Sequence, residues 1–262
     1  PITFTVGPVG GANTNLTWYS WDFGDGRTTN GAALAAASNT YAPGVYTVVV
    51  TVSNSLGAAA TNTKPPFLVS PSIAYVSLAG SNLAPYDTWE KAATAIQPAV
   101  DVAYKDVSTS TVVLVTNGVY TVGTRILVEK GITIRSVNGP TVTEVSGNNA
   151  TRVFALNAPG LVLDALTIRN GQASYGGAME IYTNCTVRNC IMRGNRCGDR
   201  GAAVRAVGGS SLLENCIVAR NYSGNGGGGS ASEGGVLTLQ QCAITGNEAA
   251  TANLRKEAKK RG

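Results

Sequence analysis

Three segments of the sequence repeat one another at a spacing of 26 residues, and this period limits the fold more than any other feature. The segments 186–195, 212–221 and 238–247 align without gaps, and Asn170 precedes the first repeated asparagine by 25 residues. The repeated positions are Cys190, Cys216 and Cys242, followed by Asn195, Asn221 and Asn247. Glycine-rich corners and no helical pattern separate the copies. A period of 26 therefore predicts one turn of a parallel β-solenoid per copy.

Stacked coils place equivalent residues above one another, about 4.8 Å apart. We therefore expect a ladder of cysteines inside the coils, in which each thiol acts as a small, nearly apolar core residue. Parallel side chains in a ladder are poorly oriented for a disulfide, and the spacing of the cysteines does not resemble a zinc site. The asparagines are expected to form a second ladder at a turn, where their amides hydrogen-bond from coil to coil.

The two ends of the predicted solenoid differ. Apolar residues at helical spacing predict a capping helix over about 88–105, with Asp87 or Thr88 as N-cap and Pro98 as a kink. Coils are expected over about 111–247, followed by a charged tail, 248–262, whose last eight residues have five basic residues against Glu257. Because this tail is poor in β-formers, we expect a truncated or frame-altered product whose frayed or weakly helical tail leaves the last coil open to self-association.

The entry into the repeats carries a family resemblance. Tyr-Val-Ser-Leu begins at Tyr75, a tryptophan-containing segment follows, and Val-Leu-Val-Thr-Asn-Gly-Val-Tyr ends at Tyr120. Over residues 74–247 this order resembles the right-handed parallel β-helix of the pectin-lyase-like superfamily. Gly-Gly-Ala-Met at 176–179, alternating with Met-Arg-Gly-Asn at 192–195, is similar to the repeats of polymorphic outer-membrane proteins. The resemblance implies a fold and a cell-surface or secreted setting, and leaves the chemistry open.

The N-terminal segment has a different pattern, with short alternating strands separated by turn clusters. Its clearest motif is Trp21-Asp-Phe-Gly-Asp-Gly26, followed about twenty residues later by Tyr-Ala-Pro-Gly-Val-Tyr. These motifs resemble the PKD domain, an immunoglobulin-like β-sandwich, which implies an extracellular spacer or a weak adhesion or sugar-contacting module. Asp22 and Asp25 suit a tight turn, Gly24 and Gly26 permit a positive φ, and Trp21 can fill the space between two sheets.

Three prolines between residues 64 and 72 mark a stiff linker. The sequence therefore predicts an all-β chain. An immunoglobulin-like β-sandwich is expected over residues 1–70, and a right-handed parallel β-helix with an N-terminal capping helix over residues 71–262.

Composition excludes several classes of function. Histidine is absent, which removes Ser-His-Asp and Cys-His catalytic systems and His-ligated metals. The net charge of +5 lies mostly in the last eight residues, since the rest of the chain has 15 basic and 14 acidic residues, so nucleic acid is not an expected partner. No apolar run approaches the about 20 residues of a membrane span. Asp22 and Asp25 supply too few ligands for calcium by themselves, and no metal or other cofactor is predicted.

Arginines and tyrosines of the coils are the candidate glycan-binding residues. Arg188 shares a column with Glu214, and three other arginines are expected near one corner with tyrosines nearby. Stacked arginine and tyrosine can hold an anionic glycan through charge and contact with sugar faces, and the alternative is a solvated face without a ligand. The full set is Arg169, Arg188, Arg193, Arg220, Tyr175, Tyr182 and Tyr222.

The acidic residues of the coils do not form a recognisable catalytic group. None stands 26 residues from another, and residues 131–247 contain no lysine, whereas lyases and hydrolases of this fold need a base or several close carboxylates. We therefore predict a secreted or surface bacterial module, part of a larger protein, that contacts a polysaccharide or cell-surface glycan in adhesion without catalysis of its own. The alternatives are a polysaccharide lyase or glycoside hydrolase acting on an acidic glycan, and a purely structural stalk.

Overall fold

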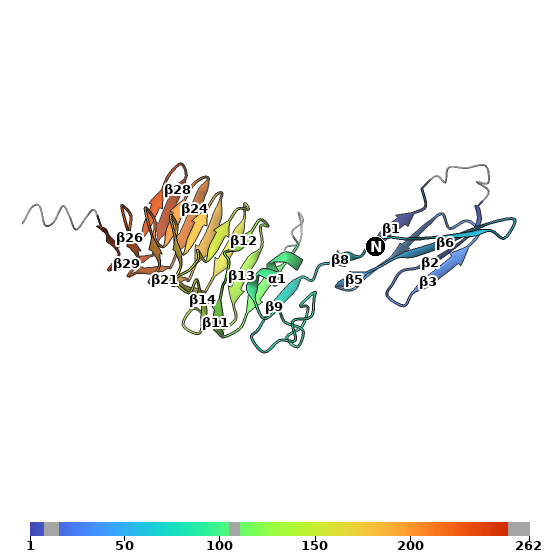
Figure 1. Cartoon of the computed structure of the whole chain (residues 1–262), viewed down its shortest axis with the longest axis horizontal. Coiled ribbons are helices and arrows are strands. Elements are labelled where there is room, and N and C mark those ends of the chain that lie inside the picture. Colours follow the sequence, from blue (N-terminus) through green and yellow to red (C-terminus); the bar gives the residue numbers. More distant parts are fainter. Residues whose placement is uncertain (8–15, 105–110, 251–262) are drawn as a thin grey trace, which may run out of the picture. The chain divides into compact units, whose positions relative to one another are not determined.

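The computed structural model describes residues 1–7, 16–104 and 111–250. Contacts within the chain divide it into two compact units, Pro1–Ser70 and Pro71–Gly262. Both units are built mainly from β-strands, and one short helix lies in the second (Figure 1). The all-β fold class predicted from the sequence is confirmed.

The first unit is a set of short antiparallel sheets. Its strands are β1 (Ile2–Thr5), β2 (Leu16–Asp22), β3 (Thr28–Gly31), β4 (Ala36–Asn39), β5 (Gly44–Tyr46), β6 (Val49–Asn54), β7 (Ala59–Thr63) and β8 (Phe67–Val69). The largest sheet has the order β3-β2-β6-β7, while β1 pairs with β4 and β5 with β8. Trp21 on β2 is buried with Phe4 and Phe23, and its indole nitrogen donates to the Leu34 carbonyl at 2.9 Å.

The turn after Trp21 accounts for the aspartates and glycines of the motif. Asp22 accepts from the Gly24 amide at 2.9 Å, and Asp25 accepts from the Arg27 amide at 3.0 Å and the Asn39 side chain at 2.8 Å. Gly24 has a φ of +76° and lies against the backbone of Thr47, where a side chain would clash. The motif is thus a structural turn whose carboxylates are used within the fold.

The second unit is a parallel β-helix with four sheets, which we call A, B, C and D in the order in which a coil passes through them. Sheet A contains β9 (Ile73–Val76), β10 (Val112–Val115), β13 (Thr133–Ser136), β16 (Leu161–Asp164), β20 (Cys185–Arg188), β24 (Ser210–Glu214) and β28 (Val236–Gln240). Sheet B contains β11 (Gly118–Thr121), β14 (Thr143–Ser146), β17 (Thr167–Arg169), β21 (Ile191–Arg193), β25 (Ile217–Ala219) and β29 (Ala243–Thr245). Sheet C contains β18 (Gln172–Ala173), β22 (Arg196–Cys197), β26 (Tyr222–Ser223) and β30 (Glu248–Ala249). Sheet D contains β12 (Ile126–Val128), β15 (Phe154–Leu156), β19 (Met179–Ile181), β23 (Val204–Ala206) and β27 (Ser230–Ser232).

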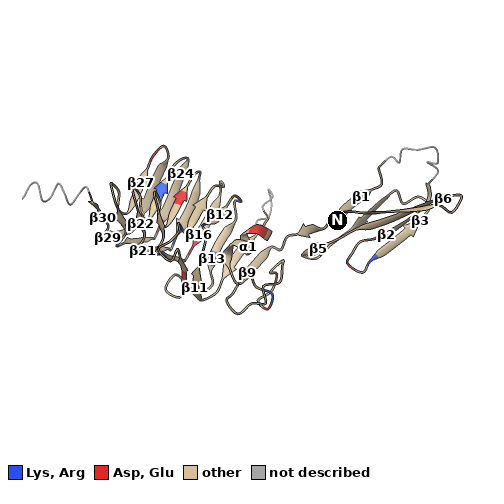
Figure 2. Cartoon of the chain, in the orientation of Figure 1, with Lys and Arg blue, Asp and Glu red and all other residues tan. Residues whose placement is uncertain are grey.

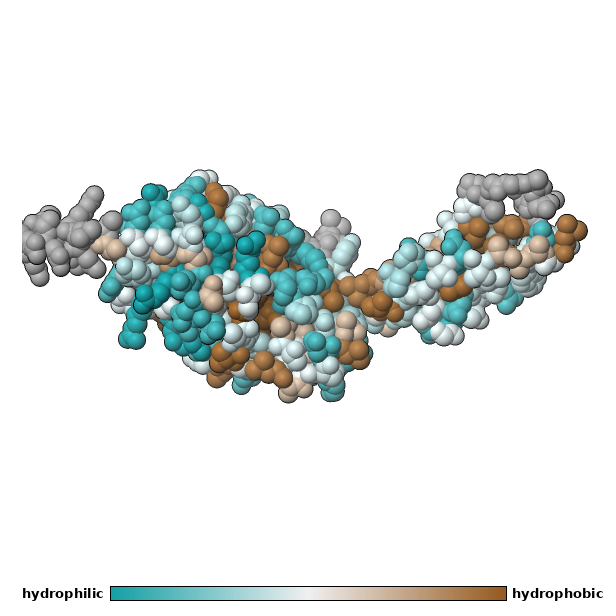
Figure 3. Space-filling view, in the orientation of Figure 1, coloured by the Kyte–Doolittle hydropathy of each residue, from teal (hydrophilic) through white to brown (hydrophobic). Residues whose placement is uncertain are grey.

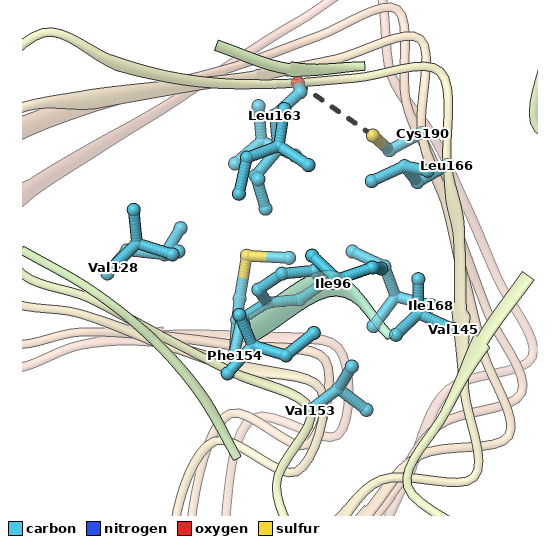
Figure 4. Packing of buried hydrophobic residues seen from close by; sticks show 14 of the residues in the cluster. Ile96, Val128, Val145, Val153, Phe154, Leu163, Leu166, Ile168 and Cys190 are labelled. Atoms are coloured by element: carbon cyan, nitrogen blue, oxygen red, sulfur yellow. Dashed lines mark hydrogen bonds between the residues drawn. The ribbon is translucent and has the colours of Figure 1, made fainter. Parts of the chain in front are cut away.

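The lumen of the β-helix is filled by aliphatic and aromatic side chains that alternate with outward residues along each strand. Phe154, Leu163, Leu166 and Ile168 are fully buried there, and Figure 4 shows them converging from different sides of the coil. Burying such side chains stabilises the fold by roughly 1.5 to 3 kcal/mol each, before conformational entropy is subtracted. The lumen is therefore a packed core.

The 26-residue register is confirmed for the last coils, whereas the 25-residue spacing from Asn170 to Asn195 does not match the register of the preceding step. Ile191 pairs with Ile217 and Ile217 with Ala243, which aligns the three ladder cysteines that immediately precede these residues. In the preceding step the offset is 24, because Arg169 pairs with Arg193. Asn170 is consequently not a member of the asparagine ladder, and Gly171 takes that position, with its amide donating to the Asn195 side chain at 2.9 Å.

The asparagine ladder connects consecutive coils through side-chain amides. Asn221 Nδ2 donates to the Met192 carbonyl at 3.0 Å and to Asn247 Oδ1 at 2.8 Å. Its own Oδ1 accepts from the backbone amide and the side chain of Asn195, at 3.0 and 2.9 Å. Asn221 and Asn195 are buried, so water has little access to the groups that they would leave unpaired after a substitution.

Replacing Asn221 with alanine should therefore destabilise the β-helix by about 2 kcal/mol or more, since a hydrogen bond contributes about 1 kcal/mol and orphaned buried partners add to the loss. Asn225→Ala is the control, because Asn225 lies in an exposed loop and its side chain donates to Asp199 at 2.9 Å. Urea unfolding of both variants measures the difference. Equal losses of stability would contradict the ladder.

The capping helix is shorter than predicted. Helix α1 spans Ile96–Val102, its N-cap residue is Ala95, and no side chain caps it. Thr88 instead accepts the Lys91 amide at 3.3 Å in an earlier turn, so neither Asp87 nor Thr88 is the N-cap. The backbone before α1 pairs with β9 and does not extend the helix: the Ala93 amide donates to the Tyr75 carbonyl, and Ala93 forms a parallel bridge to the edge of β9. Pro98 is the third helical residue, where the proline nitrogen interrupts no intrahelical hydrogen bond, and no kink is required.

Helix α1 closes the N-terminal end of the coils. Its residues Ile96, Ala99 and Val100 are buried, and Figure 4 shows Ile96 within the core. The Gln97 side chain accepts a hydrogen bond from the Leu127 amide at 2.8 Å and donates one to the Leu127 carbonyl at 3.2 Å. Both backbone groups of this residue, on the first strand of sheet D, therefore have partners. Lys130 Nζ donates to the carbonyls of residues 100, 101 and 103 and so caps the C-terminal end of the helix.

The last coil extends beyond the predicted limit at residue 247. Strand β30 (Glu248–Ala249) pairs in parallel with β26, so the tail does not begin at residue 248. Within the described part of the chain, no strand pairs with the outer edges of β28 and β29, and Ile244 is 54% exposed although its column neighbour Val218 is buried. Self-association through this coil stays a prediction, and residues 251–262, with the predicted tail conformation, lie outside the described residues. No helix among the described residues is long and apolar enough to span a membrane.

Candidate functional site

Arginines of one coil bind carboxylates of a neighbouring coil on three faces of the β-helix. On sheet A, Arg188 lies between Asp164 and Glu214 in one column, which confirms its shared column with Glu214. Its guanidinium, however, binds Asp164 at 2.9 Å, and Asn189 donates to the other oxygen of Asp164 at 2.8 Å. Arg188 is thus committed to an ion pair and is separated from the other predicted arginines.

Sheet D carries a second network, centred on the buried carboxylate of Glu180. Arg152 binds one carboxylate oxygen of Glu180, and Arg205, the register partner of Glu180 on the next coil, binds the other. Arg205 also binds Glu233, so the network links residues of four successive coils. Figure 2 shows acidic residues (red) and basic residues (blue) side by side on neighbouring strands of the β-helix.

Two of the predicted tyrosines belong to this network. Tyr182 donates to Glu180 at 2.5 Å, and burial together with this carboxylate raises the pKa of the Tyr182 phenol. The Tyr175 ring lies 4.3 Å from the Arg205 guanidinium, and a hydrogen bond to Asp199 raises the pKa of Tyr175. Both tyrosines therefore contact a network whose charges are paired with one another. Three members of this network were missed by sequence reasoning: Arg152, Arg205 and Glu233. A search for opposite charges about one coil apart would have found Glu180 with Arg205.

The remaining four predicted residues meet where sheet B passes into sheet C. Arg169 and Arg193 occupy one column and share Glu144, with Arg193 at 2.6 Å from the carboxylate. Arg220 follows β25 with a φ of +54°, and Tyr222 begins β26. Arg196, which sequence reasoning did not single out, pairs with Tyr222 in register, and its guanidinium lies 5.5 Å from the Tyr222 ring. We call Arg169, Arg193, Arg196, Arg220 and Tyr222 the arginine corner.

The charges of the arginine corner are only partly compensated. Glu144 serves both Arg169 and Arg193, whereas no ion pair to Arg196 or Arg220 occurs among the described residues. Figure 3 shows hydrophilic residues over much of the β-helix face in view, with brown residues mainly along its lower part. The arginine corner itself has an excess of guanidinium groups and one aromatic ring.

The cysteines are all unpaired thiols. Burial raises the pKa of Cys185, Cys197 and Cys216 to about 11, and raises that of Cys190 as well, so these thiols are protonated at neutral pH. In residues 1–7, 16–104 and 111–250, no group of three or more His, Cys, Asp or Glu side chains converges as a metal site.

Comparisons with known proteins address the two units differently. The family model described as PKD domain matches residues 1–65, which confirms the resemblance of the first unit. Among solved structures, the chain is similar to a pectin methylesterase crystallised in complex with a hexasaccharide, at 15% identity and a TM-score of 0.38, covering 68% of this chain and 67% of that chain. A comparison with curated proteins finds no significant match. The chain therefore combines a unit similar to PKD domains with a parallel β-helix.

Proposed function

We propose that this protein is an extracellular, non-catalytic adhesion module that contacts an acidic glycan through the arginine corner. The observation that carries the proposal is the pair of guanidinium groups, Arg196 and Arg220, which have no carboxylate partner in the described residues and flank Tyr222 on adjacent coils. Similarity of the first unit to PKD domains supports an extracellular setting.

The chemistry of the corner suits a polymer with carboxylate or sulfate groups. A guanidinium presents planar paired donors that match such anions, and a tyrosine ring offers a face for the apolar side of a sugar. The contact between Arg196 and Tyr222 holds both side chains on the surface before a ligand arrives, which lowers the entropic cost of binding. Because successive coils repeat along one axis, an extended glycan can meet several of these groups at once.

The engagement of three coil carboxylates, Glu144, Asp164 and Glu180, supports a role without catalysis. Both oxygens of Glu180 bind arginines, both oxygens of Glu144 bind arginines, and Asp164 binds Arg188 and Asn189. A general acid or base must be able to exchange a proton with substrate, and these oxygens face protein donors instead. The lyase, the hydrolase and the structural stalk remain the alternatives that the following experiment separates.

Titration calorimetry of the full chain with polygalacturonate tests the proposal, with a neutral glucan as the comparison ligand. We expect binding to polygalacturonate only, weakened by salt and reduced at least about tenfold in the double variant Arg196→Ala, Arg220→Ala. Arg135→Ala is the matched control, because Arg135 is an exposed arginine on sheet A, away from the corner. An equal effect of Arg135→Ala would contradict the site, absence of binding to any acidic glycan would favour the stalk, and release of unsaturated uronides would favour the lyase.

A further inference from the structure

The cysteine ladder brings two thiols into equivalent positions on the last two coils. Cys216 Sγ lies 3.4 Å from the Val187 carbonyl and 3.3 Å from the Glu214 carbonyl. Cys242 Sγ lies 3.4 Å from the Leu213 carbonyl and 3.3 Å from the Gln240 carbonyl. Leu213 and Gln240 are the register partners of Val187 and Glu214. The two sulfur atoms are therefore separated by the rise between coils, about 4.8 Å.

This separation selects among the structures that two thiols can form. A disulfide requires sulfur atoms about 2.05 Å apart, and tetrahedral zinc requires four ligands. Two metal–thiolate bonds of about 2.3 Å arranged in a line span about 4.6 Å, which is close to the coil rise. Parallel side chains, which disfavour a disulfide, place the two sulfur atoms one above the other along the coil axis. The ladder thus fits a cation held in linear coordination.

We propose that Cys216 and Cys242 form a site for a soft monovalent cation of the copper(I) and silver(I) class, bound between the two sulfur atoms. Soft sulfur ligands select cations of this class, and two ligands are enough for them. In binding, one thiol releases its proton to solvent and forms a metal–thiolate bond, while the other donates a sulfur lone pair as a neutral thiol. The complex then carries no net charge and no change of oxidation state occurs. A neutral complex suits this position, because Cys216 is buried among apolar residues.

The site is confined to the last two coils. Cys190 precedes Cys216 in the same column, and its Sγ lies 3.9 Å from the Leu163 carbonyl, as Figure 4 shows. Cys190 and Cys216 are each 1% exposed, whereas Cys242 is only partly buried, so a cation can enter from the side of Cys242. Bound there, the cation would fasten the last coil to the one before it.

Silver(I) added to the full chain tests this site, with one equivalent of glutathione present to compete for single thiols. Native mass spectrometry should show one silver ion per wild-type chain, and the melting temperature of the β-helix should rise. Cys242→Ser and Cys242→Ala should lose the ion and the rise, while their melting temperatures without metal stay near that of the wild type, because Cys242 is partly exposed.

Cys185→Ser and Cys197→Ser are the matched controls. Their register partners on the next coil are Ser211, which the Cys185 thiol contacts at 3.7 Å, and Ser223, so neither cysteine has a second thiol above it. Both controls should retain the silver ion. Retention by Cys242→Ser and Cys242→Ala, loss in either control, or equal binding of zinc in the presence of glutathione would overturn the proposal. None of these outcomes depends on glycan binding.

Discussion

Replacing Glu180 with glutamine should destabilise the β-helix by about 3 to 5 kcal/mol, which is a large part of the stability of a typical domain. The Glu180 side chain is 5% exposed and lies between the guanidinium groups of Arg152 and Arg205, which are themselves largely buried. Glutamine keeps the shape of the side chain and removes its charge. Arg152 then loses its carboxylate partner and Arg205 keeps only Glu233, so the desolvation of these two largely buried cations is less well offset.

Chemical unfolding followed by circular dichroism measures this loss. Glu214→Gln is the matched control, because Glu214 is a half-buried glutamate on sheet A that makes no ion pair among the described residues. We expect the control to change the free energy of unfolding by less than about 1 kcal/mol. A small effect of Glu180→Gln on the free energy of unfolding would mean that the network on sheet D contributes little to the stability of the β-helix.

Trp21→Ala should unfold the first unit and leave the second folded. Trp21 is 3% exposed, packs against Phe4 and Phe23, and donates its indole N–H to Leu34. Removing a buried tryptophan costs about 3 to 5 kcal/mol through lost burial and the cavity left behind. The two units have separate hydrophobic cores, so the loss should remain within one of them.

Differential scanning calorimetry of the full chain should show one of two thermal transitions disappear in this variant. Trp18→Ala is the control, since Trp18 lies on the same strand β2 and is 47% exposed. Both transitions should persist there. Simultaneous loss of both transitions in Trp21→Ala would show that the units unfold as one.

Local patterns were sufficient to predict the architecture. The period of 26 at Cys190, Cys216 and Cys242 predicted the β-helix, because coils of similar length that stack in register repeat their inward residues at a similar spacing. The Trp21 to Gly26 motif predicted the fold of the first unit, since its tight turn needs glycine at a positive φ and side chains that accept backbone hydrogen bonds. Both patterns are present in the folded structure, since the three cysteines lie in one column and the motif forms a tight turn.

The contacts between coils were decided by the tertiary structure. A change of offset from 26 to 24 moves Asp164 from the column of Cys190 to that of Arg188, and an offset of 25 sets Glu180 against Arg205. These offsets depend on loop lengths, to which hydrophobic alternation is insensitive, so neither the partners of the arginines nor the place of Arg196 beside Tyr222 could be read from the sequence. The capping helix was shortened for a related reason, since the backbone near Ala93 pairs with the open edge of β9 and is not available for helical hydrogen bonds.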